Sequence, residues 1–353
     1  MPYVNEKKSK MRKIIKILSL LIFLLIIVGC KSSKNSFASE ISDHYNGKKF
    51  INTNGDQGNG YKEVFKFLRT RKKGKWTKNY ETYTRDTLIK NNYTDKIKLI
   101  FVNHSTFLIQ LDTLNILTDP IWSKRCSPSQ LIGPARHRPT GITFESLPNI
   151  DVVLISHNHY DHLDKQTIKR LQKEHKPQFI VPLGVSHFCK KIGIKNVIEI
   201  DWDEEVEIKA LKIKATPAVH FSSRGIFDRD KTLWCGYMIE GSKKIYFAGD
   251  TAYDEIIFKK IGRKNPKIDL SIIPIGAYKP NWFMTRIHTN PSEAAQIHLD
   301  LKSKQSVATH FGTFALANEA QGEAIKDLKR ALLEKKIEKG KFIIPEEGIF
   351  YTY

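Results

Sequence analysis

Four potential metal ligands stand within six residues of this chain, directly after a short apolar run. The run is DVVLIS at 151–156, and HNHYDH follows it with His157, His159, Asp161 and His162. A short, continuous apolar run is typical of a strand buried on both faces. Imidazole nitrogens and carboxylate oxygens suit zinc and other borderline divalent ions. The spacing therefore predicts a metal-binding loop at the carboxyl end of a buried strand.

Three further potential ligands each end an apolar, strand-like run later in the chain. They are His220 in TPAVH, Asp250 in IYFAGD and His310 in SVATH. A single His or Asp predicts little, because most such side chains lie at the surface or make ordinary hydrogen bonds. Together with the cluster, these three predict the complete ligand set of a two-metal hydrolase.

The spacing also suggests how seven ligands serve two ions. A carboxylate has two oxygens, so Asp250 can bridge both ions, while His220 and His310 complete the two sets. Metals about 3.5–4 Å apart can share a water and generate hydroxide near neutral pH. The same pair can stabilise the attacking and leaving oxygens of a phosphodiester. We expect His157 and His159 to converge on one ion, and Asp161 and His162 to converge on the other.

Two aspartates near the cluster are expected to support it rather than to bind metal. Asp164 follows the cluster and is expected to cap the next helix or to orient a ligand. Asp119 lies at a predicted strand end in LTDP. It is expected either to contact a ligand from behind or to form the turn before Pro120.

The hydrophobic pattern alternates between strands and helices over most of the chain. Strands are expected over 96–102, 106–112, 114–118, 151–156, 179–182, 206–215, 233–240, 244–248, 269–275, 306–309 and 342–351. Helices are expected over 164–174, from Asn290 onward and over 319–336. This order predicts an α/β fold with helices on the outside of two β-sheets.

The first 29 residues have the pattern of a lipoprotein signal peptide. Basic residues precede an apolar run over 17–28, which is shorter than the roughly 20 residues of a membrane-spanning helix. The sequence IVGC resembles a bacterial lipobox, in which Cys30 is lipidated after cleavage. We expect a signal peptide over 1–29, a lipidated Cys30 with a flexible tether over 30–42, and one hydrolase domain over 43–353. An uncleaved signal anchor or a buried helix is the alternative, and Met11 can replace Met1 as the start.

The chain is strongly basic, with a net charge of +21. Basic residues are scattered, apart from the run RTRKKGKWTK at 69–78. Anionic lipid headgroups are the expected partner of a lipid-anchored basic protein, although a solvated surface explains the charge equally well. Nucleic acid is not expected, because no nucleic-acid-binding motif accompanies the charge. The isolated cysteines expected to be small buried side chains are Cys126, Cys189 and Cys235.

Longer stretches around the ligands resemble one family of the metallo-β-lactamase superfamily, the N-acylphosphatidylethanolamine-hydrolysing phospholipases D. The HxHxDH motif is typical only of the superfamily, whereas the longer stretches are more specific to the family. The resemblance runs from about residue 43 to the end of the chain. It rests on residues 42–52, 117–139, 151–164, 273–298 and 309–319.

The resemblance implies an αβ/βα sandwich with two zinc ions at one edge. It implies phospholipase D-type hydrolysis of N-acylphosphatidylethanolamine to phosphatidic acid and N-acylethanolamine. His288, in TRIHTNP, matches a family position near the reacting phosphate, although it can instead cap the helix at Asn290. Iron or manganese can occupy the same ligands. The implied sets are His157, His159 and His220 for one zinc, Asp161, His162 and His310 for the other, and Asp250 as the bridge.

Two other functions fit part of the pattern. Related superfamily members open lactones with similar ligands, so a zinc-dependent lactonase or a phosphodiesterase acting on a small sugar phosphate is the first alternative. A lipid-tethered binding protein with a vestigial site is the second, and the intact ligand set argues against it. The signal pattern places the leading hypothesis, a phospholipid hydrolase, at the bacterial cell envelope, facing the periplasm or the exterior. The sequence predicts no oligomeric state.

Overall fold

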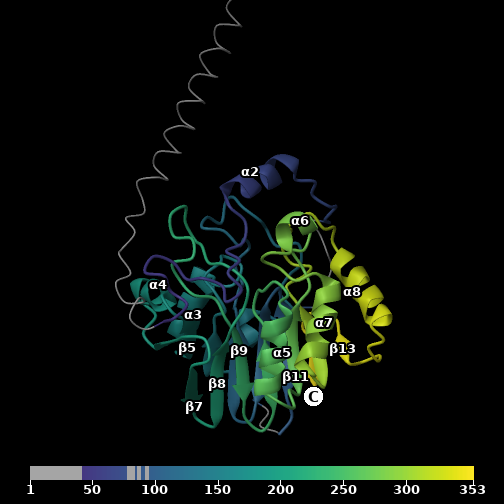
Figure 1. The fold of residues 1–353 in the computed structure, drawn as a ribbon. Helices are drawn as coiled ribbons and strands as arrows, with labels where there is room; N and C mark the ends of the chain where they lie inside the picture. The colour runs from purple at the N-terminus through teal and green to yellow at the C-terminus, as the bar shows by residue number, and fades with distance from the viewer. Residues whose placement is uncertain (1–41, 78–83, 86–88, 92–94) are drawn as a thin grey trace, which may run out of the picture.

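The computed structural model describes residues 42–77, 84–85, 89–91 and 95–353 (Figure 1). The expected signal peptide, Cys30 and nearly all of the tether therefore lie outside the described residues. Within the described part of the chain, no helix is both long enough and apolar enough to cross a membrane. The lipid anchor stays a prediction.

The first sheet has seven strands in the order β14-β1-β2-β3-β4-β5-β6. β14, β1, β2 and β3 pair antiparallel, and β3 to β6 pair in parallel. The strands are β1 (Lys98–Asn103), β2 (Thr106–Leu111), β3 (Leu114–Thr118), β4 (Val152–Leu154), β5 (Gln178–Pro182), β6 (Val197–Ile200) and β14 (Phe350–Thr352). β4 is buried throughout, as its apolar sequence predicted.

The second sheet also has seven strands, in the order β13-β12-β11-β10-β9-β8-β7. β7 to β10 pair antiparallel, and β10 to β13 pair in parallel. The strands are β7 (Glu205–Ile208), β8 (Leu211–Thr216), β9 (Gly236–Glu240), β10 (Lys244–Phe247), β11 (Leu270–Pro274), β12 (Gln305–Thr309) and β13 (Phe342–Ile343).

Helices cover the outer faces of the two sheets (Figure 1). The helices are α2 (Tyr61–Thr70), η1 (Phe144–Ser146), α3 (Lys165–Glu174), α4 (Val185–Lys191), α5 (Glu255–Lys264), α6 (Asn281–Met284), α7 (Pro291–Leu301) and α8 (Glu323–Glu334). Ile168 and Leu171 of α3 share one core with Val153 of β4, so α3 lies on the first sheet. α7 packs on β11 of the second sheet and lies between α5 and α8. The predicted αβ/βα sandwich is confirmed.

Side chains of β1 point alternately into the two hydrophobic cores on either face of the first sheet. Leu99 and Phe101 belong to the large core that also contains side chains of the second sheet. Ile100 and Val102 point to the opposite face and join the core under α3 and α4. Because successive strand residues face opposite sides, one strand builds both layers.

Two predicted strands are each divided in the structure. The strand predicted over 206–215 is a hairpin of β7 and β8, because the chain turns at Lys209, whose φ is +53°. The strand predicted over 342–351 is divided between β13 in one sheet and β14 in the other. Pro345 has no amide donor, and Gly348 has a φ of +76°, so a single strand cannot run through both.

Helix starts were predicted with mixed success. The start at Asn290 is confirmed, because its side chain accepts from the amides of Ser292 and Glu293 in a capping box. The helix predicted over 319–336 begins later, as α8 at Glu323, because Gly322 takes a left-handed conformation before it. The expectation for the three cysteines is confirmed, since Cys126, Cys189 and Cys235 are all buried.

Candidate metal centre

The loop that carries the histidine cluster is fixed at both ends. β4 leads into it, and α3 begins directly after it. Asp164 caps α3, and its carboxylate also accepts hydrogen bonds from Ser123 and Thr167. The capping role predicted for Asp164 is confirmed. His157, His159, Asp161 and His162 are therefore presented from a short segment held between a buried strand and an anchored helix.

The structure brings all seven sequence-predicted ligands together. The three later residues come from loops that follow strands of the second sheet: His220 after β8, Asp250 after β10 and His310 after β12. The seven are divided among overlapping groups whose donor atoms lie within 4.8 Å of one another. The groups containing them are His104, Asp161, His162 and His310; His157, His159 and His220; His157, His162 and Asp250; and His220, Asp250 and His288.

We call His157, His159 and His220 the first group. His157 Nε2 lies 2.7 Å from His159 Nδ1, and His220 Nε2 lies 3.3 Å from the same nitrogen. Donors around one tetrahedral zinc ion lie roughly 3.4 Å apart, given metal–nitrogen bonds of about 2.0–2.1 Å. The three imidazoles therefore converge as ligands of a single ion would.

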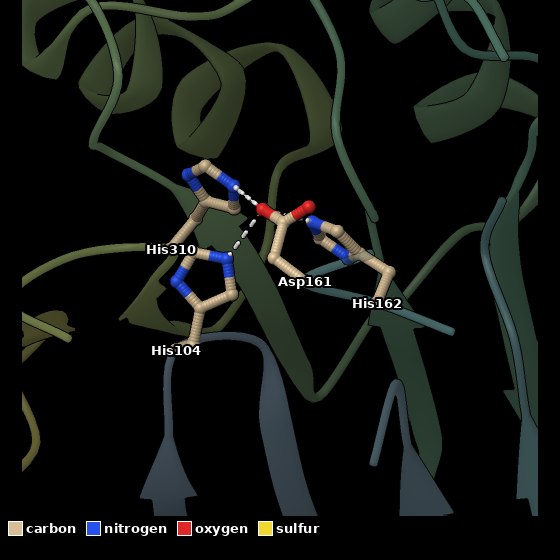
Figure 2. A group of neighbouring side chains, drawn as sticks. All are labelled: His104, Asp161, His162 and His310. Atoms are coloured by element: carbon tan, nitrogen blue, oxygen red, sulfur yellow. Dashed lines mark hydrogen bonds and ion pairs between the residues drawn. The ribbon is translucent and has the colours of Figure 1, made fainter. Parts of the chain in front are cut away.

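We call His104, Asp161, His162 and His310 the second group (Figure 2). Asp161 Oδ2 lies 2.8 Å from His104 Nε2, 3.3 Å from His162 Nε2 and 3.4 Å from His310 Nε2. Figure 2 shows the Asp161 carboxylate between these rings, with His104 and His310 contacting the same oxygen. This group places a negative charge among imidazoles, as a site for a divalent cation requires.

Asp250 lies between the two groups. Its Oδ2 atom is within 4 Å of five imidazole nitrogens, which come from both groups and from His288. The distances are 3.1 Å to His310 Nε2, 3.2 Å to His162 Nε2, 3.7 Å to His220 Nε2, 3.8 Å to His288 Nδ1 and 3.9 Å to His157 Nε2. Asp250 thus occupies the position that a bridging carboxylate needs.

Hydrogen bonds behind the ligands fix their orientation. His162 Nδ1 lies 2.7 Å from Asp119 Oδ2, and His220 Nδ1 lies 2.7 Å from the Ile287 carbonyl. Both partners are acceptors, so Nδ1 carries a proton and Nε2 faces the centre, where it can bind a cation. The position expected for Asp119 behind a ligand is confirmed.

The protonation states of the histidines in the first group also suit the binding of a metal cation. Burial lowers the pKa of His159 to about 4, and burial together with the neighbouring imidazoles lowers the pKa of His157 well below its usual value. Both rings are therefore neutral near pH 7, the form that binds metal. Asp250 Oδ1 is buried and makes no hydrogen bond within the described residues. Neutral imidazoles in the first group, together with an unsatisfied buried carboxylate oxygen, fit a metal centre.

His288 lies in the cluster rather than on the helix that follows it. Its Nδ1 is 3.8 Å from Asp250 Oδ2, and its ring lies 5.1 Å from that of His220. Burial lowers its pKa to about 4. Asn290 itself caps α7, so the capping alternative for His288 is wrong.

His104 is the member of the cluster that the sequence did not indicate. It is buried in the turn between β1 and β2, and its ring centroid is 4.2 Å from that of His310. It stands alone in its segment, without another ligand nearby in the sequence. The available signal was a histidine in a tight turn between two apolar strands, where a solvent-exposed polar residue is more usual.

Arg224 holds the metal-binding loop from the side. Its Nη1 donates to the carbonyls of Asn158 at 2.7 Å and Leu163 at 2.8 Å. The guanidinium also lies over the rings of Tyr160 and Phe188, at 4.1 and 4.5 Å from their centroids. It therefore fixes the backbone that presents ligands to both groups.

The position before Asp250, which Gly249 occupies, accepts only glycine. It has a φ of +62°, and an added Cβ would lie 2.7 Å from Ser156 Cβ and 2.9 Å from the Cys235 carbonyl. Both the conformation and the close approach require glycine. This packing brings Asp250 against the end of β4, where the cluster begins.

Comparison with known proteins agrees with this geometry. The family described as a beta-lactamase superfamily domain matches residues 114–311. The chain belongs to the β-lactamase superfamily. A possible metal-dependent hydrolase from Veillonella parvula has a similar fold, with a TM-score of 0.59 and 17% identity over 73% of this chain and 100% of that one.

Two relatives of this superfamily member are similar in sequence. An uncharacterized protein of Mycobacterium tuberculosis is 39% identical over 67% of this chain, which spans 64% of that relative's length. The N-acyl-phosphatidylethanolamine-hydrolyzing phospholipase D 1 of Caenorhabditis elegans is 36% identical over 67% of this chain and 69% of its own length. The superfamily membership and a histidine–aspartate cluster able to bind metal are thus shown, whereas the ligand role of each residue stays a prediction.

Proposed function

We propose that this protein is a dinuclear zinc hydrolase that cleaves a phosphodiester of a phospholipid. The proposed reaction is phospholipase D-type hydrolysis of N-acylphosphatidylethanolamine, or of a related phospholipid, to phosphatidic acid and N-acylethanolamine. The observation that carries the metal-dependent part is the position of Asp250 Oδ2, within 4 Å of imidazole nitrogens from both ligand groups. A bridging carboxylate is useful only to a pair of ions.

The choice of substrate rests on sequence similarity. The C. elegans relative carries the name of an N-acyl-phosphatidylethanolamine-hydrolyzing phospholipase D, and a yeast relative of the same name is 36% identical over 58% of this chain. These names support a phosphodiester of a lipid over other bonds. They do not choose among phospholipids, so the N-acyl group is the finer part of the proposal.

The described residues suggest which side chains would hold each ion and which would contact the substrate. When bound, two divalent ions would activate water and neutralise the charge of the phosphate. The first group would hold one ion, Asp161, His162 and His310 the other, and Asp250 would join them. His288 stands beside Asp250 with a side chain that is 12% exposed, so its ring can contact a substrate phosphate and hold it by a hydrogen bond.

The test is lipid-product mass spectrometry on the purified protein. Incubation with N-acylphosphatidylethanolamine should release N-acylethanolamine and phosphatidic acid, and a chelator should stop the release. Asp203→Asn is a matched control, because Asp203 is an exposed residue that pairs with Lys264 on the surface. Absence of chelator-sensitive products would overturn the substrate. Faster opening of lactones would establish the lactonase alternative instead, and elemental analysis would identify zinc, iron or manganese.

We further propose that Cys30 anchors the protein to a membrane of the bacterial envelope. The lipobox-like sequence before Cys30 supports this location. Intact mass spectrometry of membrane-extracted protein should find a chain that starts at Cys30 and carries acyl groups. The Cys30→Ser variant should keep its signal peptide and lack the added mass. An unmodified Cys30 in the native protein would overturn the anchor.

A further inference from the structure

One helix exposes a stripe of large apolar side chains. On α2, Tyr61 is 80% exposed, Phe65 67% and Leu68 62%. Their spacing of four and then three residues places them on one face of the helix. Such a stripe is unusual on a helix that already buries another face in the protein. Phe67 of α2 is only 7% exposed, so the stripe is a second apolar face.

The buried face of α2 connects it to the metal centre. Phe67 stacks on Phe283 with ring centroids 4.6 Å apart, and both share a small core with Ile287. The carbonyl of Ile287 accepts the hydrogen bond from His220. The helix that carries the exposed stripe is therefore connected, through this small core, to the residue that orients a candidate ligand. Figure 1 shows α2 and α6 together at one end of the molecule, beyond the ends of the strands.

Basic side chains run beside the apolar stripe. Lys62, Lys66 and Arg69 are exposed, and none of them forms an ion pair with another residue that the structure describes. Lys66 Nζ lies 4.7 Å from the ring centroid of Trp282 in α6, and Trp282 is 43% exposed. The surface thus combines aromatic and aliphatic side chains with cations that no described carboxylate neutralises.

We propose that α2 and Trp282 form a docking surface for the headgroup region of an anionic phospholipid bilayer. An amphipathic helix with aromatic and aliphatic residues on one face and Lys or Arg beside them is the arrangement that binds at such an interface. Tryptophan and tyrosine favour the boundary between headgroups and acyl chains. The inference rests on the proposed function, since a bilayer at this end of the molecule would present its lipids beside the metal centre.

The charge of α2 favours a bilayer over a second copy of the chain. Two copies that met through this face would bring Lys62, Lys66 and Arg69 close to the same residues of the other copy. Anionic headgroups would instead neutralise these cations. The chemistry of the surface therefore matches a lipid partner and opposes self-association.

A fluorescent probe on α2 tests the surface without relying on catalysis or on the lipid anchor. The probe is an environment-sensitive dye attached to the full chain through Phe65→Cys, in a background with Cys30→Ser. The native thiols at Cys126, Cys189 and Cys235 are buried, and burial raises their pKa values, so they react slowly. Leu333→Cys is the matched control, because Leu333 is 80% exposed on α8.

Vesicles containing phosphatidylglycerol should shift the emission of the probe at position 65 to the blue, and a quencher buried in the bilayer should quench it. The probe at position 333 should respond little. Replacing Lys62, Lys66 and Arg69 with Gln should weaken vesicle binding at position 65 about tenfold or more, with an unchanged far-ultraviolet spectrum.

Three results would overturn the inference: equal responses at positions 65 and 333, an equal response to neutral phosphatidylcholine vesicles, or a shift at position 65 that grows with protein concentration without vesicles. The last would identify a second copy as the partner. A positive probe response with no lipid hydrolysis would retain the docking surface and reject the proposed substrate. Hydrolysis without a probe response would do the reverse.

Discussion

The two ligand groups are close neighbours but are built differently. The first group consists of three imidazoles, whereas the second contains the carboxylate of Asp161 among its imidazoles. Burial lowers the pKa of His159 in the first group to about 4. In the second group, burial opposes the charge of His310, yet the carboxylates of Asp250 and Asp161 raise its pKa to about 9. The second group without metal therefore holds positive charge as protons, and the first does not.

This difference suggests unequal binding of the two ions. The first group offers lone pairs at once, while the second offers a carboxylate and a stronger attraction for cations. Asp250 connects them, because it lies 3.2 Å from His162 and 3.7 Å from His220. Substitutions that act on one group, on both, or on neither can separate their contributions.

The largest effect is expected for Asp250→Asn, which removes charge from both groups. An amide oxygen is a weak bridge, and the amide nitrogen repels a cation. We expect hydrolytic activity to fall on the order of 10³-fold or more, with the fold retained. Lipid-product mass spectrometry measures the loss, and circular dichroism checks the fold beside the Asp203→Asn control. Activity within tenfold of the unmodified protein would show that Asp250 is not the bridge.

Two further single substitutions should each remove one ion. His220→Ala acts on the first group and His310→Ala on the second. We expect each variant to retain about one metal ion per chain instead of two, and to lose activity about 10²-fold or more. Elemental analysis after dialysis gives the stoichiometry. Loss of both ions from either variant would show that the groups form one cooperative site.

The sequence predicted those members of the two ligand groups that a local sequence pattern marks. The spacing of His157, His159 and Asp161 is local, so it is visible in the sequence. His220 and Asp250 follow strand-like runs. β8 and β10 run in the same direction, with β9 antiparallel between them, so the residues that follow them meet at one edge of the sheet. The family resemblance strengthened both inferences. The sandwich fold followed from the same alternation of strands and helices.

What the sequence missed depends on contacts between distant segments. His104 belongs to the second group only because the end of β1 lies beside the loop that follows β12. Its backbone carbonyl accepts a hydrogen bond from the amide of His310 in that loop. Arg224 lies in a polar loop and has no motif, yet it binds the carbonyls of the metal-binding loop. The hairpin turn at Lys209 was overlooked, although the apolar positions change from Val206 and Ile208 before it to Leu211 and Ile213 after it, which breaks a strict period of two.

The support behind the second group is tested by Asp119→Asn. Asp119 accepts from His162 Nδ1 and from Ser156, so an amide can reverse one of these hydrogen bonds and misdirect the ring. Loss of such a partner typically costs 10- to 100-fold in metal affinity or activity. Metal competition with a chromophoric chelator measures the affinity of each ion. Equal weakening of both ions would show that Asp119 does not act on the second group alone.

Arg224→Lys should affect the two groups equally, because Arg224 holds the loop between them. Lysine keeps the charge and can donate hydrogen bonds, but it lacks the planar guanidinium that lies over the rings of Tyr160 and Phe188 while it donates. We expect the free energy of unfolding to fall by about 2 kcal/mol and both metal affinities to fall by a similar factor. Urea unfolding and the same chelator competition check this. Arg170→Lys is a matched control, since Arg170 pairs with Glu145 and Glu174 on the surface.

The smallest effect is expected for His104→Gln, which decides whether the second group has a fourth member. His104 Nε2 lies 2.8 Å from Asp161 Oδ2, so it either binds an ion or holds the carboxylate that does. A glutamine can keep the hydrogen bond to Asp161 but is a poor zinc ligand. If His104 is a support, as its contact with Asp161 indicates, the variant should bind two ions and lose activity less than about tenfold. His175→Gln, outside the cluster, is the control. Loss of one ion from the His104 variant would make His104 a ligand and give the second group four donors besides the bridge.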